Sequence, residues 1–172
     1  GTSATEINKN VLNGKGVLDG RAASVIQADS TNSINEVYLI SHALLETANG
    51  TSPLARGIKY NGTTVYNMYG IGAYDYDPNG TGAKYAYNQG WTSVEKAIVG
   101  GAAFVAKSYI HAGQDTLYKM RWNPESMSTK GYASHQYATD IGWAVKQTAR
   151  MAQIYGMLTQ YTLLYDIPSY RK

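Results

Sequence analysis

The chain has 172 residues, 44% of them hydrophobic and 16% charged, with a formal net charge of +3, a composition typical of one globular domain. The absence of cysteine excludes a disulfide framework, a thiol nucleophile and a thiolate metal site. Because the basic residues form no cluster and no apolar run reaches the ~18 residues of a membrane span, we expect neither nucleic-acid binding nor membrane insertion.

The N-terminal part of the chain is predicted to be a tail followed by two helices. Residues 1–15 are expected to be a linker or tail, and residues 16–172 are expected to form a single catalytic domain. Apolar residues at helical spacing predict a short helix over residues 19–29. A longer helix is predicted over residues 34–48, where the capping box Ser33-x-x-Glu36 precedes the apolar stripe.

The middle of the chain changes from helix to strand and then to loop. Pro53 and Gly57 delimit one predicted helical turn, since proline is favoured at the start of a helix and glycine after its end. Residues 58–66 carry strand formers on both sides of Asn61-Gly62, which is the signature of a hairpin with a type I′ turn. Residues 67–90 lack any sustained period, which predicts a long irregular segment of the kind that carries function.

The following part of the chain is again predicted to be helical. The capping box Thr92-x-x-Glu95 begins a helix that contains Gly100-Gly101. Each of these glycines costs roughly 1 kcal/mol relative to alanine, so we expect a neighbouring group to pack closely there. Asp115 is expected to cap a short helix over residues 117–121, and residues 122–134 are expected to form a loop.

The longest helix is predicted near the C-terminus. Thr139 or Asp140 is expected to cap it, and residues 161–172 are expected to form an extended tail. Its predicted apolar stripe contains Ile141, Ala144, Val145, Thr148, Met151, Tyr155 and Leu158.

The aromatic composition indicates a wet groove. The chain contains sixteen tyrosines and three tryptophans but one phenylalanine. A protein that needs aromatic rings only for its core would use more phenylalanine, because a buried phenol must find a hydrogen-bond partner. Rings with a polar edge suit a groove that stacks on a polar, flat-faced ligand such as a sugar. The alternative is that many of these tyrosines are simply half-buried.

Glu46 is the carboxylate whose position best suits acid catalysis. It lies near the end of the helix over residues 34–48, where the helix dipole disfavours a negative charge, and it follows Leu44 and Leu45, which desolvate it. Both effects raise the pKa of a carboxyl group, and a general acid must be protonated near neutral pH. On the pattern alone, a solvated glutamate at a helix end stays an open alternative.

Asp75 and Asp77 are the other carboxylates without an evident structural role, because the remaining nine lie in tails, caps, helix starts or polar loops. Asp77-Pro78-Asn79-Gly80 is a good turn, which leaves Asp75 as the better functional candidate. His42 and Glu46 share a helix face, but no H-E-x-x-H is present and the other histidines lack matching spacing. We therefore predict no metal site and no cofactor. No G-x-S-x-G elbow of a serine hydrolase is present either.

Six segments of the chain carry a resemblance to a known family. They are LLETANGTSPLARG, NMYGIGAYD, GAKYAYNQGW, AIVGGAAFVAKSYI, TLYKMRWNP and HQYATDIGWA. Together, from about Gly16 to Tyr170, they resemble the endo-β-N-acetylglucosaminidase domain of Gram-positive autolysins, glycoside hydrolase family 73. This resemblance implies a mainly α (α+β), lysozyme-like fold, in which a helical lobe and a small β-hairpin lobe flank a cleft.

The resemblance also implies roles for individual residues. Glu46 matches the general acid, and Tyr137 of HQYATD matches a tyrosine that lines the reaction centre. Asn67, Tyr69 and Gly70 of NMYG match the segment that borders the cleft.

Further candidates for contact with the substrate are Tyr74 and Trp122. The second carboxylate varies across the family, and Asp75 is the nearest substitute here. A nucleophilic carboxylate stands about 5 to 5.5 Å from the acid and a water-activating base about 6.5 to 9.5 Å away. If Asp75 is farther away than either, the substrate's own N-acetyl oxygen is the expected nucleophile, with Tyr137 helping to position it.

The activity implied by the resemblance is hydrolysis of the bond that follows N-acetylglucosamine in the glycan strands of peptidoglycan. It further implies a secreted, cell-wall-associated protein of larger, modular build, with wall-anchoring repeats and a signal outside this chain. Two alternatives stay open: a non-catalytic glycan-binding module that uses the same groove, and a lytic transglycosylase, whose product is a 1,6-anhydro sugar.

Overall fold

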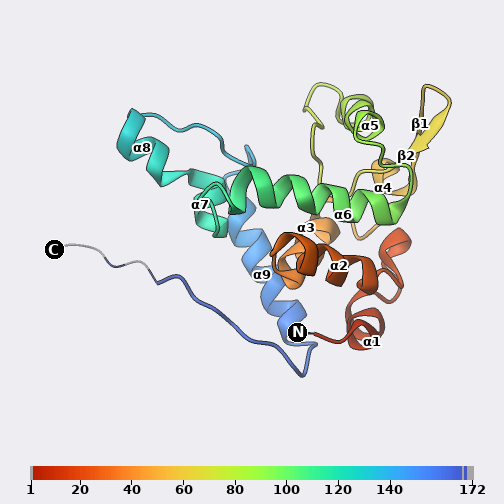
Figure 1. Cartoon of the computed structure of the whole chain (residues 1–172), viewed down its shortest axis with the longest axis horizontal. Coiled ribbons are helices and arrows are strands. Elements are labelled where there is room, and N and C mark those ends of the chain that lie inside the picture. Colours follow the sequence, from red (N-terminus) through yellow and green to blue (C-terminus); the bar gives the residue numbers. More distant parts are fainter. Residues whose placement is uncertain (1, 168, 170–172) are drawn as a thin grey trace.

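The computed structural model of the chain describes residues 2–167 and residue 169. It is mainly helical, with one two-stranded sheet among the described residues (Figure 1). The helices are α1 (Ala4–Ile7), α2 (Ala22–Asn32), α3 (Glu36–Glu46), α4 (Pro53–Arg56), α5 (Pro78–Asn88), α6 (Val94–Val105), α7 (Leu117–Trp122), α8 (Pro124–Lys130) and α9 (Trp143–Tyr155). Short π or 3-10 segments are η1 (Asn8–Leu12), η2 (Gly16–Leu18) and η3 (Ala106–Ile110).

Helix α3 is the central element of the fold. Every residue from Val37 to Leu44 is buried, as expected for a helix that is covered on all sides. Helix α3 packs against α2 and α9, and α2 packs against α6. Glu46, the last residue of α3, is therefore positioned by a helix that is packed against its neighbours along most of its length.

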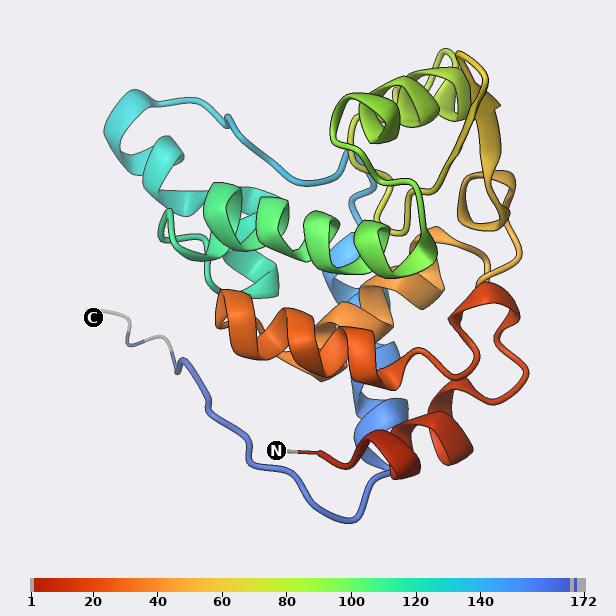
Figure 2. The ribbon, with the colours of Figure 1, turned by 45° about the vertical axis from the view of Figure 1, so that its right-hand side comes forward.

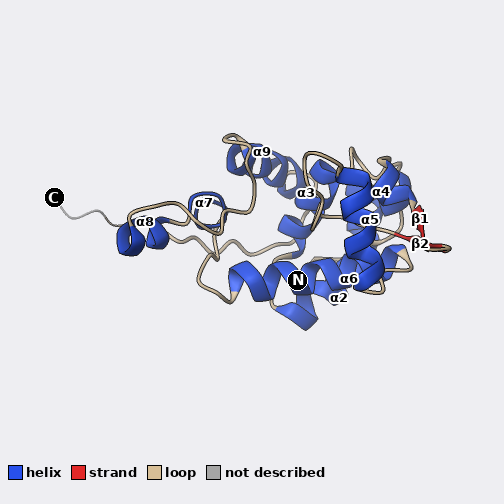
Figure 3. Cartoon of the chain, turned by 90° about the horizontal axis from the view of Figure 1, so that it is seen from above, coloured by secondary structure: helices blue, strands red, loops and turns tan. Residues whose placement is uncertain are grey.

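The strands form a small lobe at one end of the molecule. Strands β1 (Ile58–Tyr60) and β2 (Thr63–Val65) pair antiparallel, and α4 and α5 lie beside them (Figure 3). In Figure 2, this lobe and the α7–α8 region rise on opposite sides of α6. The predicted mainly α fold with a small β-hairpin lobe is confirmed. None of the helices in the described part of the chain has the length and apolarity needed to cross a membrane.

Local sequence patterns located several elements correctly. Asn61 and Gly62 have positive φ values of 46° and 80°, as the type I′ turn requires. A helical turn lies between Ser52 and Gly57, with Pro53 at its first position. The pair Gly100-Gly101 is packed as expected, because an added Cβ would overlap the indole of Trp91 or the ring of Tyr69.

Helix α9 follows Gly142, which makes no side-chain cap bond, instead of the predicted cap Thr139 or Asp140. The other three predicted caps were wrong by one or two residues. The side chain of the true cap accepts a backbone N–H from the first turn of its helix, and a neighbouring polar residue resembled it in the sequence. The observed caps are Asn35 instead of Ser33, Ser93 instead of Thr92, and Thr116 instead of Asp115.

The structure differs from the prediction of a linker over residues 1–15. Residues Ala4–Leu12 form α1 and η1, which pack beside α2. Ile7, Val11 and Leu12 are buried in the common core. Polar residues surround these three in the sequence, so their helical spacing did not predict a helix. The domain therefore includes part of the segment predicted to be a tail.

Two segments predicted to be irregular contain helices. Asp77 caps α5 and Asn123 caps α8, each with proline at the first helical position. These Asp-Pro and Asn-Pro pairs resemble turns, yet they are equally good helix starts. Packing requires glycine at position 82 inside α5, because an added Cβ there would come within 2.8 Å of the Leu54 side chain.

Helix α9 buries part of the predicted stripe. Ala144, Met151, Tyr155 and Leu158 pack on the core as predicted, but the buried face is rotated away from the other members. Ile141 and Val145 are 75% and 73% exposed, whereas Trp143, Gln147 and Ile154 are buried. Residues 161–167 have no regular secondary structure, as predicted, and the rest of that predicted tail lies outside the described residues except for residue 169.

Candidate active site

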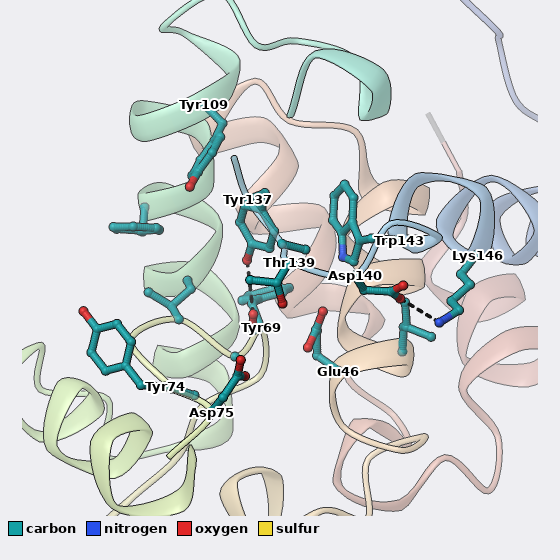
Figure 4. Close-up of a pocket in the computed structure, with 17 residues that line it drawn as sticks. Glu46, Tyr69, Tyr74, Asp75, Tyr109, Tyr137, Thr139, Asp140, Trp143 and Lys146 are labelled. Carbon is teal, nitrogen blue, oxygen red and sulfur yellow. Dashed lines mark hydrogen bonds and ion pairs between the residues drawn. The ribbon is translucent and has the colours of Figure 1, made fainter. Parts of the chain in front are cut away.

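A cleft with a volume of about 620 Å³ opens beside the C-terminal end of α3. Four segments line it: the end of α3, the loop over residues 69–75, the side of α6 and η3, and the segment that leads into α9. Figure 4 shows Glu46 between the loop that carries Asp75 and the segment that carries Asp140 and Trp143.

Six of the eight residues predicted from the sequence line this cleft. Asn67 and Trp122 do not. The six are Glu46, Tyr69, Gly70, Tyr74, Asp75 and Tyr137. The cleft also contains residues that were not predicted, among them Tyr109, Asp140, Trp143 and Lys146. Asp140 and Trp143 belong to the HQYATDIGWA segment, so this motif was the available signal for them.

Asn67 stabilises the loop over residues 69–75 through hydrogen bonds. Its side chain is buried and donates to the carbonyl oxygens of Ile71, at 2.8 Å, and Gly82, at 3.3 Å. Its own side-chain oxygen accepts the backbone N–H of Tyr69. Asn67 therefore shapes the loop and does not line the cleft.

Trp122 likewise lies outside the cleft lining. Its ring is covered by the guanidinium of Arg121, 4.1 Å from the ring centroid. Arg121 donates to the backbone carbonyls of Asp140, at 2.8 Å, and Thr139, at 3.1 Å. The pair of Arg121 and Trp122 therefore supports the segment that leads into α9, and Trp122 itself does not line the cleft.

The loop backbone comes very close to Glu46 at Gly70. This glycine has a φ of +66°, and a Cβ added to it would lie 3.1 Å from Glu46 Oε2. A side chain there would be strained by the backbone conformation and would also crowd the carboxyl group. Glycine at this position therefore allows the loop backbone to lie directly against the carboxyl group of Glu46.

Glu46 is held in a poorly hydrated environment. Its side chain is 29% exposed, and burial raises the pKa of its carboxyl group, with a smaller contribution from the negative charge of Asp140. The indole N–H of Trp143 opposes this increase, although it forms no hydrogen bond of ordinary length. Desolvation was one of the two causes predicted from the sequence.

His42 lies one helical turn before Glu46 and is completely buried. Burial lowers the pKa of His42 to about 3, so its imidazole is neutral near neutral pH. We assign the 3.0 Å hydrogen bond with Tyr38 as donated by the hydroxyl to Nδ1, because no other acceptor contacts that hydroxyl among the described residues. The proton of the ring is then on Nε2, which lies 3.7 Å from Glu46 Oε1 without a hydrogen-bond partner.

Tyr137 ties the two walls of the cleft together. Its hydroxyl donates to the backbone carbonyl of Tyr69 at 3.1 Å, next to Gly70. Its ring stacks on Trp143 and meets His42 edge-on, with centroids 5.1 and 4.9 Å apart. Burial raises the pKa of the Tyr137 hydroxyl well above its ordinary value, so it stays a hydrogen-bond donor.

Two further carboxylates line the cleft, and they differ in their hydrogen bonds and ion pairs. Asp140 forms an ion pair with Lys146 at 2.6 Å and accepts the N–H of Gly142, and these contacts lower the pKa of Asp140. Asp75 is exposed and forms no hydrogen bond or ion pair with any residue that the structure describes. Within the same residues, no three His, Asp or Glu side chains gather as a metal site.

A carboxyl group whose pKa is raised by burial, at the foot of a cleft in a mainly helical fold with a small hairpin lobe, is the arrangement of a lysozyme-like glycoside hydrolase. The family model described as mannosyl-glycoprotein endo-beta-N-acetylglucosaminidase matches residues 22–156. The chain therefore belongs to this glucosaminidase family, and the family resemblance predicted from six motifs is confirmed.

Individual relatives agree with this assignment. A beta-N-acetylglucosaminidase of Bacillus subtilis (strain 168) is 62% identical over 174 residues, covering 99% of this chain and 19% of the relative, so the chain spans about a fifth of that protein.

Crystal structures of S. aureus Autolysin E are similar as well. One is a catalytic glutamate-to-alanine mutant in complex with the disaccharide NAG-NAM, with a TM-score of 0.79 and 41% identity over 91% of this chain and 68% of that chain. Another contains the muropeptide NAM-L-Ala-D-iGlu, with a TM-score of 0.80 and 40% identity over 96% and 73% of the two chains. The lysozyme-like fold is thereby confirmed.

Proposed function

We propose that this chain is the catalytic domain of a peptidoglycan hydrolase that cleaves the glycosidic bond after N-acetylglucosamine. The observation that carries the proposal is Glu46, a carboxyl group whose pKa is raised by burial and which faces an open cleft. Support comes from the family and from the disaccharide NAG-NAM bound to the related Autolysin E.

In the proposed reaction, Glu46 donates its proton to the oxygen of the leaving sugar as the glycosidic bond breaks. The carboxyl group then becomes negatively charged while it is still partly desolvated. Among the described residues, the N–H groups of Trp143 and His42 have no hydrogen-bond partner. His42 Nε2 lies 3.7 Å from Glu46 Oε1 and the indole of Trp143 acts on the same carboxyl group, so both are placed to stabilise the charge after a small shift of the side chain. Tyr74 and Tyr137 provide aromatic surface along the sugar, while the buried ring of Tyr69 supports the loop from inside the core.

The second carboxylate is proposed to be Asp75. Asp140 is less suited because its carboxylate is already paired with Lys146, whereas Asp75 is unpaired among the described residues and lies on the loop opposite Glu46 (Figure 4). In this role Asp75 activates the attacking water or stabilises the positive charge that develops on the sugar ring.

Asp75→Asn is expected to lower kcat by at least about tenfold, as the loss of a general base does. Asp140→Asn, the matched change across the cleft, is expected to lower it less than about threefold, the size of a modest change in local charge. The check is the rate of release of reducing ends from glycan strands. A near-normal rate for Asp75→Asn points instead to attack by the N-acetyl oxygen of the substrate.

Trp143→Phe is expected to raise the pKa of Glu46 further, because the indole N–H that favours the ionised carboxylate is removed. Glu46 acts in its protonated form, so kcat/KM falls as the pH rises through its pKa. The alkaline limb of the pH profile should therefore move to higher pH. Tyr132→Phe, an exposed aromatic residue that does not line the cleft, serves as the control. An alkaline limb that does not move in Trp143→Phe contradicts the assigned role.

The cellular setting is proposed from the family. The B. subtilis relative is much longer than this chain, so we propose that the domain is part of a modular protein that acts on the cell wall outside the cell, with wall-anchoring repeats elsewhere. Peptidoglycan glycan strands are its proposed partner.

A glycan-binding module with the same groove is the main competing function. Purified peptidoglycan incubated with the chain distinguishes the two, because a hydrolase releases new reducing ends and a binding module only sediments with the wall. Binding to the wall without release of reducing ends would overturn the proposed function.

A further inference from the structure

A second groove adjoins the cleft on the outer side of the loop over residues 69–75. Its volume is about 360 Å³. Ile71, Gly72, Tyr74 and Phe104 line both spaces, so the two hollows are separated only by the width of this loop. A ligand that fills the cleft can therefore extend a substituent directly into the second groove.

The entrance of the second groove carries two exposed aromatic rings. Tyr74 and Tyr76 are 60% and 82% exposed, and their rings are stacked with an interplanar angle of 4° and centroids 5.9 Å apart. The backbone N–H of Tyr74 donates to Thr81 Oγ1 at 2.8 Å, and Tyr74 bridges to Asp77, the cap of α5. These contacts attach the backbone of Tyr74 to α5. Binding of a ligand to the two rings therefore costs less conformational entropy, because this part of the loop is already held in place.

The second groove has a positive charge and no opposing carboxylate in its lining. Lys84 projects from α5 into the lining, is exposed, and forms no hydrogen bond or ion pair with the described residues. Asn88 lies one helical turn further on, and none of the lining residues is acidic. A groove that combines aromatic rings with one unpaired ammonium group and one amide suits a short peptide with a free carboxylate.

We propose that this groove binds the acidic stem peptide of the glycan strand, with Lys84 pairing with its carboxylate. The proposal rests on the proposed function, since the sugar that bears the peptide must occupy the cleft beside Glu46. The muropeptide bound to the related Autolysin E combines a sugar with an acidic dipeptide, which is the chemistry that the adjoining cleft and groove would recognise. The groove would make the enzyme select strands that still carry their peptides.

The test compares two substrates: glycan strands that carry stem peptides and strands from which an amidase has removed them. For Lys84→Glu, kcat/KM on the peptide-bearing strands should fall about tenfold at low salt, since an ion pair is lost and a repulsion of similar size is added. On stripped strands kcat/KM should stay within about twofold of the unchanged protein. Lys9→Glu, at the exposed N-terminal segment η1 away from the cleft, is the control with the same charge change and should cleave both substrates normally.

Direct binding provides a readout that does not depend on turnover. Titration calorimetry of the muropeptide NAM-L-Ala-D-iGlu into Glu46→Gln should show a Kd that weakens about tenfold when Lys84→Glu is added. An equal loss on both strand types would make the groove a sugar subsite and overturn the proposal, as would the absence of any effect of Lys84→Glu. If the unchanged protein cleaves neither substrate, the proposed function fails; the calorimetric titration still decides whether the groove binds the peptide.

Discussion

Glu46→Gln is expected to lower kcat on glycan strands by about 10²- to 10⁴-fold, the range that a general acid contributes. Glutamine preserves the size of the side chain and its contacts with Gly70 and Trp143, but it has no proton to donate to the leaving oxygen. The measurement is the initial rate of release of reducing ends under conditions in which the unchanged protein is saturated.

The fold of Glu46→Gln is expected to be intact and, at neutral pH and above, at least as stable. Burial raises the pKa of Glu46 in the folded state, so the folded state binds its proton more tightly than the unfolded state does. This contribution to stability is fully present below the unfolded pKa and is lost as the pH rises through the folded pKa. Glutamine carries no charge to desolvate. Glu125→Gln, exposed on α8, is the control and should retain full activity.

Gly101→Val is expected to lower the free energy of unfolding by about 3 kcal/mol, the upper part of the range for overpacking a core. A Cβ at Gly101 would overlap the ring of Tyr69, which is fully buried and donates a hydrogen bond to the carbonyl of Ile98 at 3.2 Å. The ring cannot move away without breaking this bond or disturbing the loop. The check is the midpoint of denaturant unfolding at constant slope.

Activity should fall in the same variant even where it is folded. Tyr69 precedes Gly70, whose backbone lies against the carboxyl group of Glu46, so a displaced ring shifts the wall of the cleft at the reaction centre. Ala103→Val introduces the same side chain on a half-buried position of α6 and should change stability by less than about 1 kcal/mol, the difference in helix propensity between the two residues. Equal unfolding midpoints for the two variants would contradict close packing at Gly101.

Features that depend on neighbours in the sequence were predicted well. The hairpin follows from the φ preferences of Asn61-Gly62, and the short helix α4 follows from Pro53 and Gly57. The pattern made Glu46 a candidate, because a helix end and adjacent leucines raise the pKa of a carboxyl group, and the family resemblance matched it to the general acid. Burial is the main cause of its raised pKa in the structure. These signals are local, so a single sequence contains them.

Features that depend on tertiary contacts were not predictable in the same way. Tyr137 reaches the carbonyl of Tyr69 from a distant part of the chain, and Trp143 is buried against His42 although the stripe of α9 was expected to include Ile141 and Val145. Hydrophobic periodicity cannot tell which face of an amphipathic helix meets an aromatic cluster. For the same reason, the sequence made Asp75 the candidate second carboxylate by elimination and turn chemistry, but it could not place Asp75 relative to Glu46.

The chemical identity of the new reducing end is the most direct test of the proposed reaction. Products released from purified peptidoglycan are reduced with borohydride and analysed by mass spectrometry. We expect reduced N-acetylglucosamine at the end of every new fragment, and none after incubation with Glu46→Gln. Fragments that end in reduced N-acetylmuramic acid or in a 1,6-anhydro sugar, or fragments released equally by Glu46→Gln, would contradict the assigned bond and the role of Glu46.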